Sequence, residues 1–430
     1  MSLEKGQLVY ANTLEQRLVV QEKLGEGGQG EVYSVTDGEN TYALKWYSFE
    51  QSTQEQKEAI NYLVKQGGPT GIAGQRFIWP LDIITIEQIK EFGYLMPLID
   101  TNRFAELGEV QAHRKPAPSL PTLCEISYQI ANSYRALHLS GYCYRDIAAG
   151  NIMFDPNSGE VLICDNDNVG INRQSKSQVW GTMEYMAPEL ILAKADPSIE
   201  TDLYALAVLL FNIWVWHHPF HGQMEYNIYV WDIPAKRRIY AEIPVFIFDP
   251  IDNRNKLPND PEYSTANKRW NYCPASLQAL FIRAFTDGIH NPSSRVTEGE
   301  WQQLFLQLKN GSINCNKCQA ENLWDQAPLN CWHCNSEIPI APKLVLTDET
   351  SQQIVLLTSN KQLFTESQLI GQVVQNPNNP KIWGIRNLTT MEWTALFPDG
   401  TKKVIEPQRA APLRLGLKLK IGEVAAEIVA

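Results

Sequence analysis

The stretch "LGEGGQGEVYSV", residues 24–35, carries three glycines at the spacing Gly25-x-Gly27-x-x-Gly30. A dinucleotide-binding fold uses the same spacing, but there the glycines lead into a helix. Here Gly30 leads into "EVYSV", whose Val and Tyr residues favour a strand. No Lys-Ser or Lys-Thr follows, so the stretch is not a Walker A loop either. It predicts a β-hairpin lid whose glycines let backbone N–H groups approach phosphate groups closely.

The segments around this hairpin predict a small strand-rich lobe followed by a larger helical lobe. Three strands are expected in residues 18–47, and a polar helix is expected in residues 51–67. In the third strand, "YALK" would place Ala43 against a nucleotide and Lys45 near its phosphate oxygens. From residue 121 to about residue 308, apolar residues recur mostly at helical spacing.

Two loops of the helical lobe carry residues suited to phosphoryl transfer. "YCYRDIAAGNIMF" (142–154) holds Asp146 and Asn151 at the spacing of a catalytic loop. A carboxylate there accepts the proton of an attacking hydroxyl, and an amide oxygen binds magnesium. In "VLICDNDNVG" (161–170), Asp165 follows a hydrophobic strand, where such an enzyme places a metal-binding Asp.

Three further motifs follow in the same lobe. "GTMEYMAPE" (181–189) contains an Ala-Pro-Glu signature, and "TDLYALAVLL" places Asp202 at the start of a buried helix. "NPSSRVT" offers Arg295, which we expect to pair with Glu189.

In this order, the motifs resemble those of the eukaryotic-type protein kinase family over residues 12–309. The "YRD" and "DND" variants are similar to a bacterial branch of that family. The resemblance implies an α+β, bilobal kinase domain over residues 1–309, with an N-lobe at about 1–96 and a C-lobe at about 100–309. It also implies ATP and Mg²⁺ (or Mn²⁺). "GTMEYMAPE" looks more like Ser/Thr than Tyr kinases, so phosphate transfer to Ser/Thr hydroxyls of the chain itself or of partner proteins is implied.

The resemblance assigns a role to each motif residue. Asp146 would orient the nucleophile, while Asn151 and Asp165 would hold magnesium. In the hinge "LMPLI" (95–99), a Met would be the gatekeeper, Pro would offer its carbonyl and Ile its N–H. The residues implied to bind the nucleotide are Gly25, Gly27, Gly30, Val32, Ala43, Lys45, Met96, Pro97, Ile99 and Met153.

Two assignments stay open. A helix glutamate should pair with Lys45, and Glu58 fits best because Ile60, Leu63 and Val64 would make an apolar face while it points inward. Glu55, one turn earlier, is the rival. The phosphorylated residue of the activation loop would be Ser175, Ser177 or Thr182.

Three positions depart from the family pattern. Asn166 replaces a Phe that couples the helix to closure, and Asp167 replaces a Gly that permits a backbone flip. Both changes affect the regulatory switch and spare Asp165. Ala148 stands where Ser/Thr kinases usually place a Lys beside the transferring phosphate, so slower rather than absent activity is expected. The alternative to an active protein kinase is a nucleotide-binding pseudokinase scaffold. A small-molecule kinase is disfavoured because "GTMEYMAPE" builds a peptide-substrate platform.

Two polar clusters have simpler explanations than binding sites. His217, His218 and His221 lie in "WHHPFHG" with no Cys or carboxylate at metal-binding spacing, which favours a structural loop. "AKRR" (235–238) is interpreted as a solvated face, with substrate docking as the alternative.

Residues 310–338 resemble a zinc ribbon. Cys315-x-x-Cys318 and Cys331-x-x-Cys334 are two knuckles at the spacing of a closed tetrahedral zinc site. A redox pair needs one such motif at a helix start rather than two framing a loop. His333 could replace one Cys ligand.

Residues 340–430 resemble, more weakly, a forkhead-associated β-sandwich, through "IWGIRNLTTMEWTALFPDGT" and the closing "APLRLGLKLKIGEVAAEIV". Such domains usually read phosphothreonine through a Gly-Arg pair and a Ser/His set. Here Gly371 is followed by Gln372, and no His follows His333. The sequence therefore predicts the sandwich but not phosphothreonine binding.

The overall composition limits the partners. The formal net charge of −11 argues against a general nucleic-acid binder. The longest apolar stretch (203–216) is too short to span a membrane, and the N-terminus lacks the pattern of a signal peptide. A reducing cytoplasm is expected, because four of the eight cysteines have metal-ligand spacing. Resemblance to bacterial kinases of this layout suggests a partner Ser/Thr phosphatase and an adaptor protein.

Overall fold

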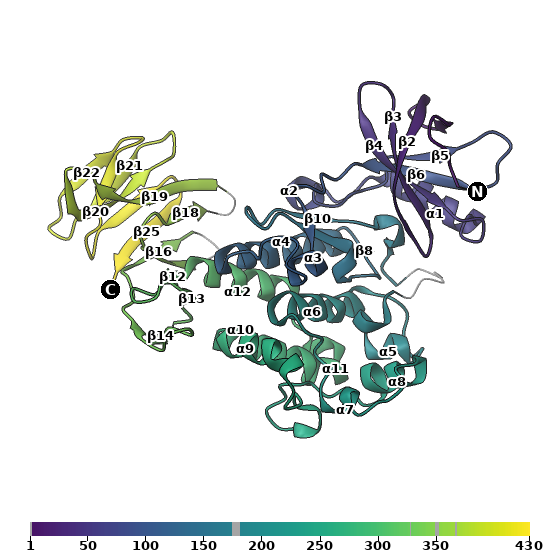
Figure 1. The fold of residues 1–430 in the computed structure, drawn as a ribbon. Helices are drawn as coiled ribbons and strands as arrows, with labels where there is room; N and C mark the ends of the chain where they lie inside the picture. The colour runs from purple at the N-terminus through teal and green to yellow at the C-terminus, as the bar shows by residue number, and fades with distance from the viewer. Residues whose placement is uncertain (1, 174–180, 327, 349–351, 366–367) are drawn as a thin grey trace. The chain divides into compact units, whose positions relative to one another are not determined.

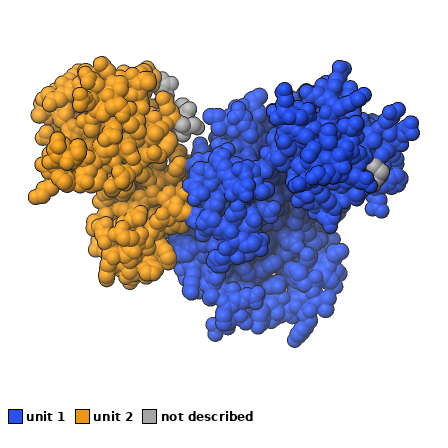
Figure 2. Space-filling view, turned by 45° about the horizontal axis from the view of Figure 1, so that its top comes forward, with its two compact units in different colours: residues 1–118, 125–273, 277–302 blue, residues 119–124, 274–276, 303–430 orange. Residues whose placement is uncertain are grey.

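The structure is a computed structural model that describes residues 2–173, 181–326, 328–348, 352–365 and 368–430 (Figure 1). The chain forms two compact units, which Figure 2 distinguishes by colour. The first unit comprises residues 1–118, 125–273 and 277–302, and the second comprises residues 119–124, 274–276 and 303–430. The change from one unit to the other near residue 302 falls within helix α12 (Glu298–Asn310).

The first unit begins with a closed barrel in the order β1-β2-β3-β4-β6-β5. Its strands are β1 (Leu8–Ala11), β2 (Gln16–Gly27), β3 (Gly30–Thr36), β4 (Thr41–Tyr47), β5 (Asp82–Thr85) and β6 (Phe92–Pro97). Alternate residues point inward, as the β period of two requires, and Leu18, Val35, Leu44 and Trp46 are buried in its core. The three strands predicted within residues 18–47 are confirmed as β2, β3 and β4.

The glycine-rich hairpin joins β2 to β3, where Gly27 pairs with Gly30. A Cβ on Gly30 would lie 2.1 Å from the carbonyl oxygen of Trp46 on β4. That distance is far inside van der Waals contact, so only glycine lets the base of the hairpin lie against β4. By contrast, a Cβ on Gly28 would meet no atom within 4 Å.

Helix α1 (Gln54–Gln66) follows β4, as the polar segment predicts. The side chain of Thr53 caps its N-terminus by accepting a hydrogen bond from the N–H of Gln56. Ile60 and Leu63 are its buried residues. The helix ends at Gly67, which has a positive φ of 72°, a conformation that glycine adopts at little cost.

The rest of the first unit is mostly helical and is built around α6 (Ile199–Val215), which is buried along nearly its whole length. The ring of Phe211 on α6 contacts the rings of Phe246, Phe281 and Phe285 at centroid distances of 5.2–5.6 Å. The other helices are α2 (Gly71–Gly74), α3 (Leu107–Gln111), α4 (Leu120–Leu139), α5 (Pro188–Ile191), α7 (Gln223–Tyr226), α8 (Ile233–Arg237), α9 (Ser264–Tyr272), α10 (Ala275–Phe285) and α11 (Asp287–His290).

Short strands hold the loops of this helical part. They are β7 (Ala105–Glu106), β8 (Tyr142–Cys143), β9 (Ile152–Phe154), β10 (Val161–Ile163) and β11 (Gly170–Ile171). One sheet has the order β10-β9-β7, and β11 pairs with β8. The segments that precede and follow each predicted catalytic loop are thereby fixed by strand pairing.

The second unit contains two small hairpins and two larger sheets. The hairpins are β12 (Ser312–Asn314) with β13 (Glu321–Leu323), and β14 (Leu329–Asn330) with β15 (Glu337–Ile338). One sheet has the order β17-β16-β25-β24-β21-β22 and the other β18-β19-β20-β23. Their strands are β16 (Lys343–Thr347), β17 (Gln352–Leu356), β18 (Gln362–Thr365), β19 (Gln368–Asn376), β20 (Asn379–Asn387), β21 (Trp393–Leu396), β22 (Lys402–Ile405), β23 (Ala410–Pro412), β24 (Lys418–Ile421) and β25 (Val424–Val429).

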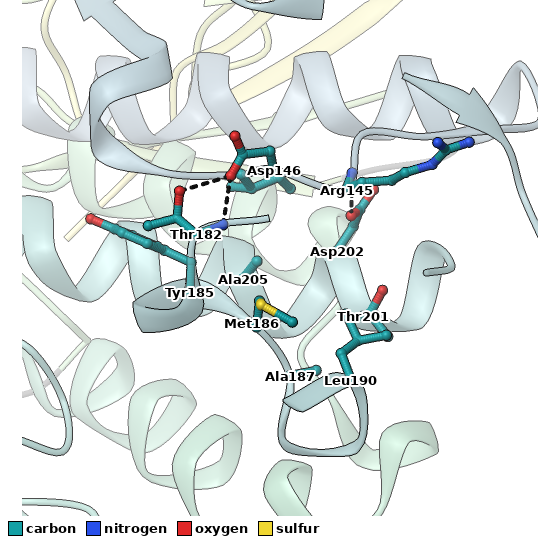
Figure 3. Close-up of a pocket in the computed structure, with 11 residues that line it drawn as sticks. Arg145, Asp146, Thr182, Tyr185, Met186, Ala187, Leu190, Thr201, Asp202 and Ala205 are labelled. Atoms are coloured by element: carbon teal, nitrogen blue, oxygen red, sulfur yellow. Dashed lines mark hydrogen bonds between the residues drawn. The ribbon is translucent and has the colours of Figure 1, made fainter. Parts of the chain in front are cut away.

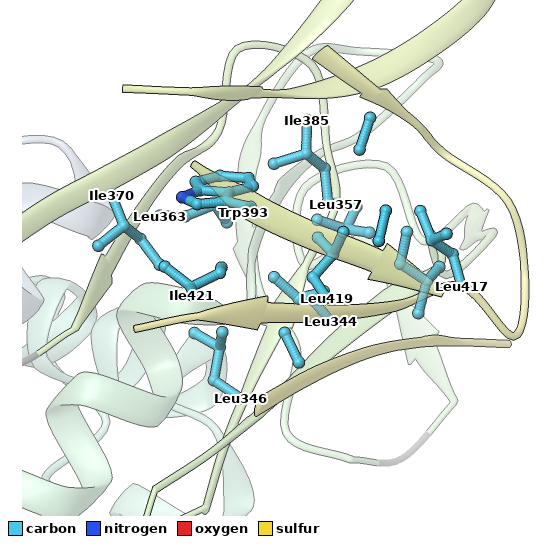
Figure 4. Packing of buried hydrophobic residues seen from close by; sticks show 14 of the residues in the cluster. Leu344, Leu346, Leu357, Leu363, Ile370, Ile385, Trp393, Leu417, Leu419 and Ile421 are labelled. Carbon is cyan, nitrogen blue, oxygen red and sulfur yellow. The ribbon is translucent and has the colours of Figure 1, made fainter. Parts of the chain in front are cut away.

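These two sheets share one hydrophobic core (Figure 4). Leu363 and Ile385 from one sheet and Leu344, Trp393 and Leu419 from the other are buried in it. The all-β region expected after residue 340 is therefore present as two packed sheets. Among the described residues, no helix is both long enough and apolar enough to cross a membrane.

Candidate active site

The loop that carries Asp146 is anchored on helix α6. The carboxylate of Asp202 accepts the N–H of Tyr144 at 2.5 Å and the N–H of Arg145 at 3.0 Å. Arg145 has a φ of 73°, a strained backbone for a residue with a side chain, so these two bonds hold the turn in place. Asp202 also lies 3.1 Å from Nε2 of His138, whose other ring nitrogen contacts Glu298.

Burial alone would lower the pKa of His138, but the hydrogen bonds and charges of Asp202 and Glu298 raise it to about 9. His138 is therefore protonated near neutral pH. It forms a buried charged network with the two carboxylates behind the catalytic loop.

Asp146 faces Thr182 (Figure 3), and the side chain of Asn151 lies within hydrogen-bond distance of Asp146. One carboxylate oxygen of Asp146 accepts the N–H of Thr182 at 2.8 Å and its hydroxyl at 2.9 Å. The amide nitrogen of Asn151 donates to the backbone carbonyl of Asp146 at 2.8 Å. A hydroxyl is thus held directly on the predicted catalytic carboxylate, in the position that a general base requires.

Lys45 lies close to Asp165. The Nζ atom of Lys45 lies 3.4 Å from Asp165, 2.9 Å from Asp167 and 2.7 Å from the side-chain oxygen of Gln29 in the glycine-rich hairpin. Burial alone would lower the pKa of Lys45, but the charges of Asp167 and Asp165 raise it. Lys45 therefore stays charged although its side chain is buried.

The expected ion pair between Lys45 and Glu58 is not formed. Glu58 is exposed and its carboxylate accepts a hydrogen bond from Gln54 at 2.9 Å, and its rival Glu55 is exposed too. Helical phase explains this correction. Residues 56, 60 and 63 share one face of a helix, whereas residue 58 lies about 200° around the axis from residue 60.

Gln56, not Glu58, is therefore the α1 side chain that reaches the hydroxyl of Tyr47 on β4 of the barrel. It donates to the hydroxyl of Tyr47 at 3.1 Å, and that hydroxyl donates to Asp167 at 2.5 Å. Burial, followed by the charge of Asp167, raises the pKa of Tyr47 well above its usual value, so the hydroxyl remains a donor. The sequence interpretation missed Gln29, Tyr47, Gln56 and Asp167; the i, i+4, i+7 pattern of Gln56 with Ile60 and Leu63 was the available signal for one of them.

Asp165 adopts a left-handed conformation, with φ 51° and ψ 48°, at the start of a 3-10 turn, η2 (Asn166–Asn168). The hydroxyl of Tyr144 donates to the carbonyl of Cys164 and lies 3.4 Å from that of Asp165. Asn166 is buried, and its amide nitrogen donates to the carbonyl of Ile163 at 2.9 Å. The side chain at position 166 is thus held by a backbone partner of its amide nitrogen rather than by apolar packing, while its buried side-chain oxygen has no hydrogen-bond partner among the described residues.

The residues predicted to contact a nucleotide base lie on the strands around Lys45. Ala43 on β4 is directly opposite Met96 on β6, and both are buried. Val32 pairs with Lys45 across β3 and β4, and Met153 is buried on β9. Pro97 ends β6 and is exposed, and Ile99 follows it.

A family model of the protein kinase domain matches residues 18–297, which is more than half of the chain. The chain belongs to the protein kinase family. The kinase is 27% identical over 218 residues to the serine/threonine-protein kinase sck2 of Schizosaccharomyces pombe, a match that covers 48% of this chain and 32% of sck2.

Bacterial relatives are similar as well. Identity is 25% over 249 residues to the DNA damage-responsive serine/threonine-protein kinase RqkA of Deinococcus radiodurans, covering 55% of this chain and 34% of RqkA. The chain is 22% identical over 321 residues to the protein kinase YegI of Escherichia coli O157:H7, a match that covers 70% of this chain and 47% of YegI. The kinase thus spans about a third of the length of sck2 and RqkA and about half of YegI.

The activation segment of the kinase is fixed at its C-terminal end. Arg295 is buried and pairs with Glu189 at 2.8 Å, as the sequence predicts. Of the three candidate phosphorylation sites, Ser175 and Ser177 lie outside the described residues, and Thr182 has its hydroxyl on Asp146.

The histidine cluster is part of the C-lobe packing. Nε2 of His218 lies 2.8 Å from the carbonyl of Glu184, and Nε2 of His221 lies 2.6 Å from the hydroxyl of Tyr240. Burial lowers the pKa of His221 to about 4, so this ring is neutral near pH 7. In the adjacent basic run, Lys236 pairs with Glu184 at 2.7 Å. These contacts agree with a structural loop.

The four paired cysteines converge at the ends of the two small hairpins. Sγ atoms of Cys315, Cys318, Cys331 and Cys334 all lie within 4.8 Å of one another. Two of these separations, Cys315 to Cys334 and Cys318 to Cys331, are 3.6 Å. A tetrahedral zinc with Zn–S bonds of about 2.3 Å requires S–S separations of about 3.8 Å.

Neighbouring polar groups suit thiolates at this cluster. The N–H of Lys317 lies 3.4 Å from the Sγ atom of Cys315, and the hydroxyl of Ser336 lies 3.3 Å from that of Cys334. Hydrogen bonds from Ser336 lower the pKa of Cys334 to about 6. His333 instead packs its ring on Trp332, and the described cluster contains cysteines alone.

In the C-terminal sandwich, the absence of a side chain at Gly371 allows close packing against β20 and the ring of Trp393. A Cβ there would lie 2.9 Å from both the Arg386 carbonyl and the Trp393 ring. The neighbouring Gln372 is directed to the carbonyl of Asn360, at 3.4 Å. Lys381 is exposed.

Proposed function

We propose that the chain is an ATP- and magnesium-dependent protein kinase that phosphorylates Ser and Thr hydroxyls of itself or of partner proteins. The observation that carries the proposal is the contact of 2.9 Å between the hydroxyl of Thr182 and the carboxylate of Asp146, beside Asn151. Asp146 accepts a hydroxyl in this structure, and a substrate hydroxyl would take the same place.

The roles of the surrounding residues follow from their positions. Lys45, charged and held by acidic partners, would neutralise phosphate oxygens under the glycine-rich hairpin. Asn151 and Asp165 supply the amide and carboxylate oxygens that magnesium prefers. When bound, the metal would offset the negative charge of the phosphates. Because position 148 is Ala, the positive charge at the phosphates would come from Lys45 and the metal, which supports slow transfer.

Two accompanying proposals concern the second unit. The thiolate cluster would hold one structural Zn²⁺ with no open position, which makes residues 310–338 a zinc ribbon. Residues 340–430 would be a forkhead-associated-like sandwich without a phosphate-binding arginine. Thiolate ligands persist in a reducing compartment, so we expect the kinase to act in the cytoplasm, on protein substrates.

The direct test measures phosphate incorporation from labelled ATP with magnesium, into the protein and into a general Ser/Thr substrate. Asp146→Asn should abolish incorporation and leave nucleotide affinity within about twofold, because it removes the base and keeps the shape of the side chain. Asp399→Asn, an exposed carboxylate in the sandwich, is the matched control and should transfer at the wild-type rate. Equal background incorporation by wild type and Asp146→Asn would favour the pseudokinase scaffold.

A further inference from the structure

Lys45 has an unusual set of partners for a protein kinase. In active members of the family, a glutamate of the helix after the third strand holds this lysine. Among the residues that the structure describes, two of its three oxygen partners, Asp165 and Asp167, come from one short segment, and the third is Gln29. The glutamates of α1 are exposed.

We propose that Asp167 is the positioning residue for Lys45, in place of a helix glutamate. The proposal rests on the proposed kinase function and deepens it. The nucleotide-binding lysine is held by the segment that also carries Asp165, so α1 does not have to move inward to complete the site.

The burial of Asp167 supports a pairing role. Its side chain is 0% exposed, and one oxygen accepts both Lys45 at 2.9 Å and Tyr47 at 2.5 Å. A carboxylate without water is strongly unfavourable unless it is paired and hydrogen-bonded. Its other oxygen has no hydrogen-bond partner among the described residues, so the contacts with Lys45 and Tyr47 determine where the carboxylate lies.

The same geometry argues against a role of Asp167 as a metal ligand. The side chain of Asp165 is 45% exposed and is open to an ion, whereas the side chain of Asp167 is enclosed and its bonded oxygen already receives two donors. Helix α1 reaches this pair through neutral hydrogen bonds, from Gln56 to Tyr47 and from Tyr47 to Asp167. Helix α1 therefore supports the pair but contributes no charge to it.

The test compares variants by the KM for ATP, by kcat and by the affinity for a fluorescent ATP analogue without transfer. Asp167→Asn keeps the shape and loses the charge, so it should weaken nucleotide affinity and raise KM roughly tenfold, with a smaller change in kcat. Glu58→Gln is the matched control and should stay within about twofold of wild type.

A rescue pair distinguishes positioning from a structural role. Asp167→Gly should weaken nucleotide affinity, and adding Gln56→Glu should restore much of it, because Gln56 and Asp167 are hydrogen-bonded to the same hydroxyl, that of Tyr47. In the wild-type background, Gln56→Glu should weaken affinity, since two carboxylates would then compete for Lys45. Gln56→Glu would then raise nucleotide affinity in the Asp167→Gly background and lower it in the wild-type background. Loss of packing alone would not reverse the direction of its effect.

This test can fail or succeed independently of the test for phosphate transfer. Nucleotide affinity reports on Asp167 even if no variant transfers phosphate. If Glu58→Gln weakens affinity tenfold while Asp167→Asn leaves it unchanged, the helix glutamate holds Lys45 and the proposal is wrong. If Asp167→Asn fails to fold, unchanged affinity in Glu58→Gln together with weakened affinity in Gln56→Glu supports the proposal, and the reverse pattern overturns it.

Discussion

His138 and Asp202 share a buried contact of 3.1 Å, and the same carboxylate of Asp202 accepts two backbone N–H groups of the loop that carries Asp146. The pKa of His138 is raised from 6.5 to about 9. Because the folded-state pKa is raised, the protonated ring contributes its full stabilisation below about pH 6.5 and loses it as the pH rises through about 9. The shift corresponds to at most about 3 kcal/mol.

His138→Gln removes the titrating group and should therefore lower the free energy of unfolding most at pH 6. The difference from wild type should shrink as the pH approaches 9.5, as measured by urea denaturation at several pH values. A constant difference across this range would show that the ring acts through packing alone.

The glycine-rich hairpin offers a matched pair of substitutions. Gly30→Ala should destabilise the protein by roughly 1–3 kcal/mol, because its Cβ would collide with the carbonyl of Trp46. Gly28→Ala meets no atom within 4 Å and should change stability by less than about 0.5 kcal/mol. Thermal unfolding of both variants checks this, and equal losses would argue against close packing of the hairpin on β4.

The thiolate cluster should bind one zinc ion per chain, which elemental analysis measures directly. Cys331→Ser removes a ligand and should lower the zinc content well below one per chain, whereas Cys273→Ser, at a buried cysteine outside the cluster, should keep it. Removal of the metal with a chelator should expose residues 312–338 to protease. Wild-type protein free of zinc, with this segment still protected, would contradict the assignment.

Phosphothreonine peptides should bind the full-length chain no better than the same peptides without phosphate. A phosphate dianion is recognised by charge-assisted donors, typically an arginine fork, but position 372 is Gln and the segment 376–383 offers one flexible cation, Lys381. Fluorescence titration with paired peptides tests this expectation. Micromolar affinity that disappears on dephosphorylation and in Lys381→Gln would make the sandwich a phosphate reader after all.

Much of the active site could be predicted because sequence spacing determines it. Asp146 and Asn151 lie on one short loop, and Lys45 is placed by the register of a strand, so local pattern was sufficient. The pairing of Arg295 with Glu189 was also predicted, because both residues belong to recognised motifs.

The partner of Lys45 could not be predicted in the same way. It depends on the rotation of α1 about its axis and on a contact between residues 122 positions apart in the chain, Lys45 and Asp167. From the sequence, an Asp in place of a Gly indicates only the loss of a flexible hinge. Its role as a counter-charge can be recognised only once the fold places the segment of Asp167 next to Lys45. Family expectation favoured Glu58, whereas the i, i+4, i+7 face that Gln56 shares with Ile60 and Leu63 was the physical evidence against it.

The Lys45–Asp167 pair has a consequence for how such a site could evolve. Aspartate and glycine codons differ by a single base, and so do those of glutamine and glutamate, so the arrangement with a helix glutamate lies two base changes away at positions 167 and 56. On the proposed role of Asp167, neither order is neutral: one intermediate leaves the lysine with Asp165 as its acidic partner, and the other adds a further carboxylate next to Asp167. The two solutions are separated by a fitness valley, and a lineage that holds one of them is expected to keep it.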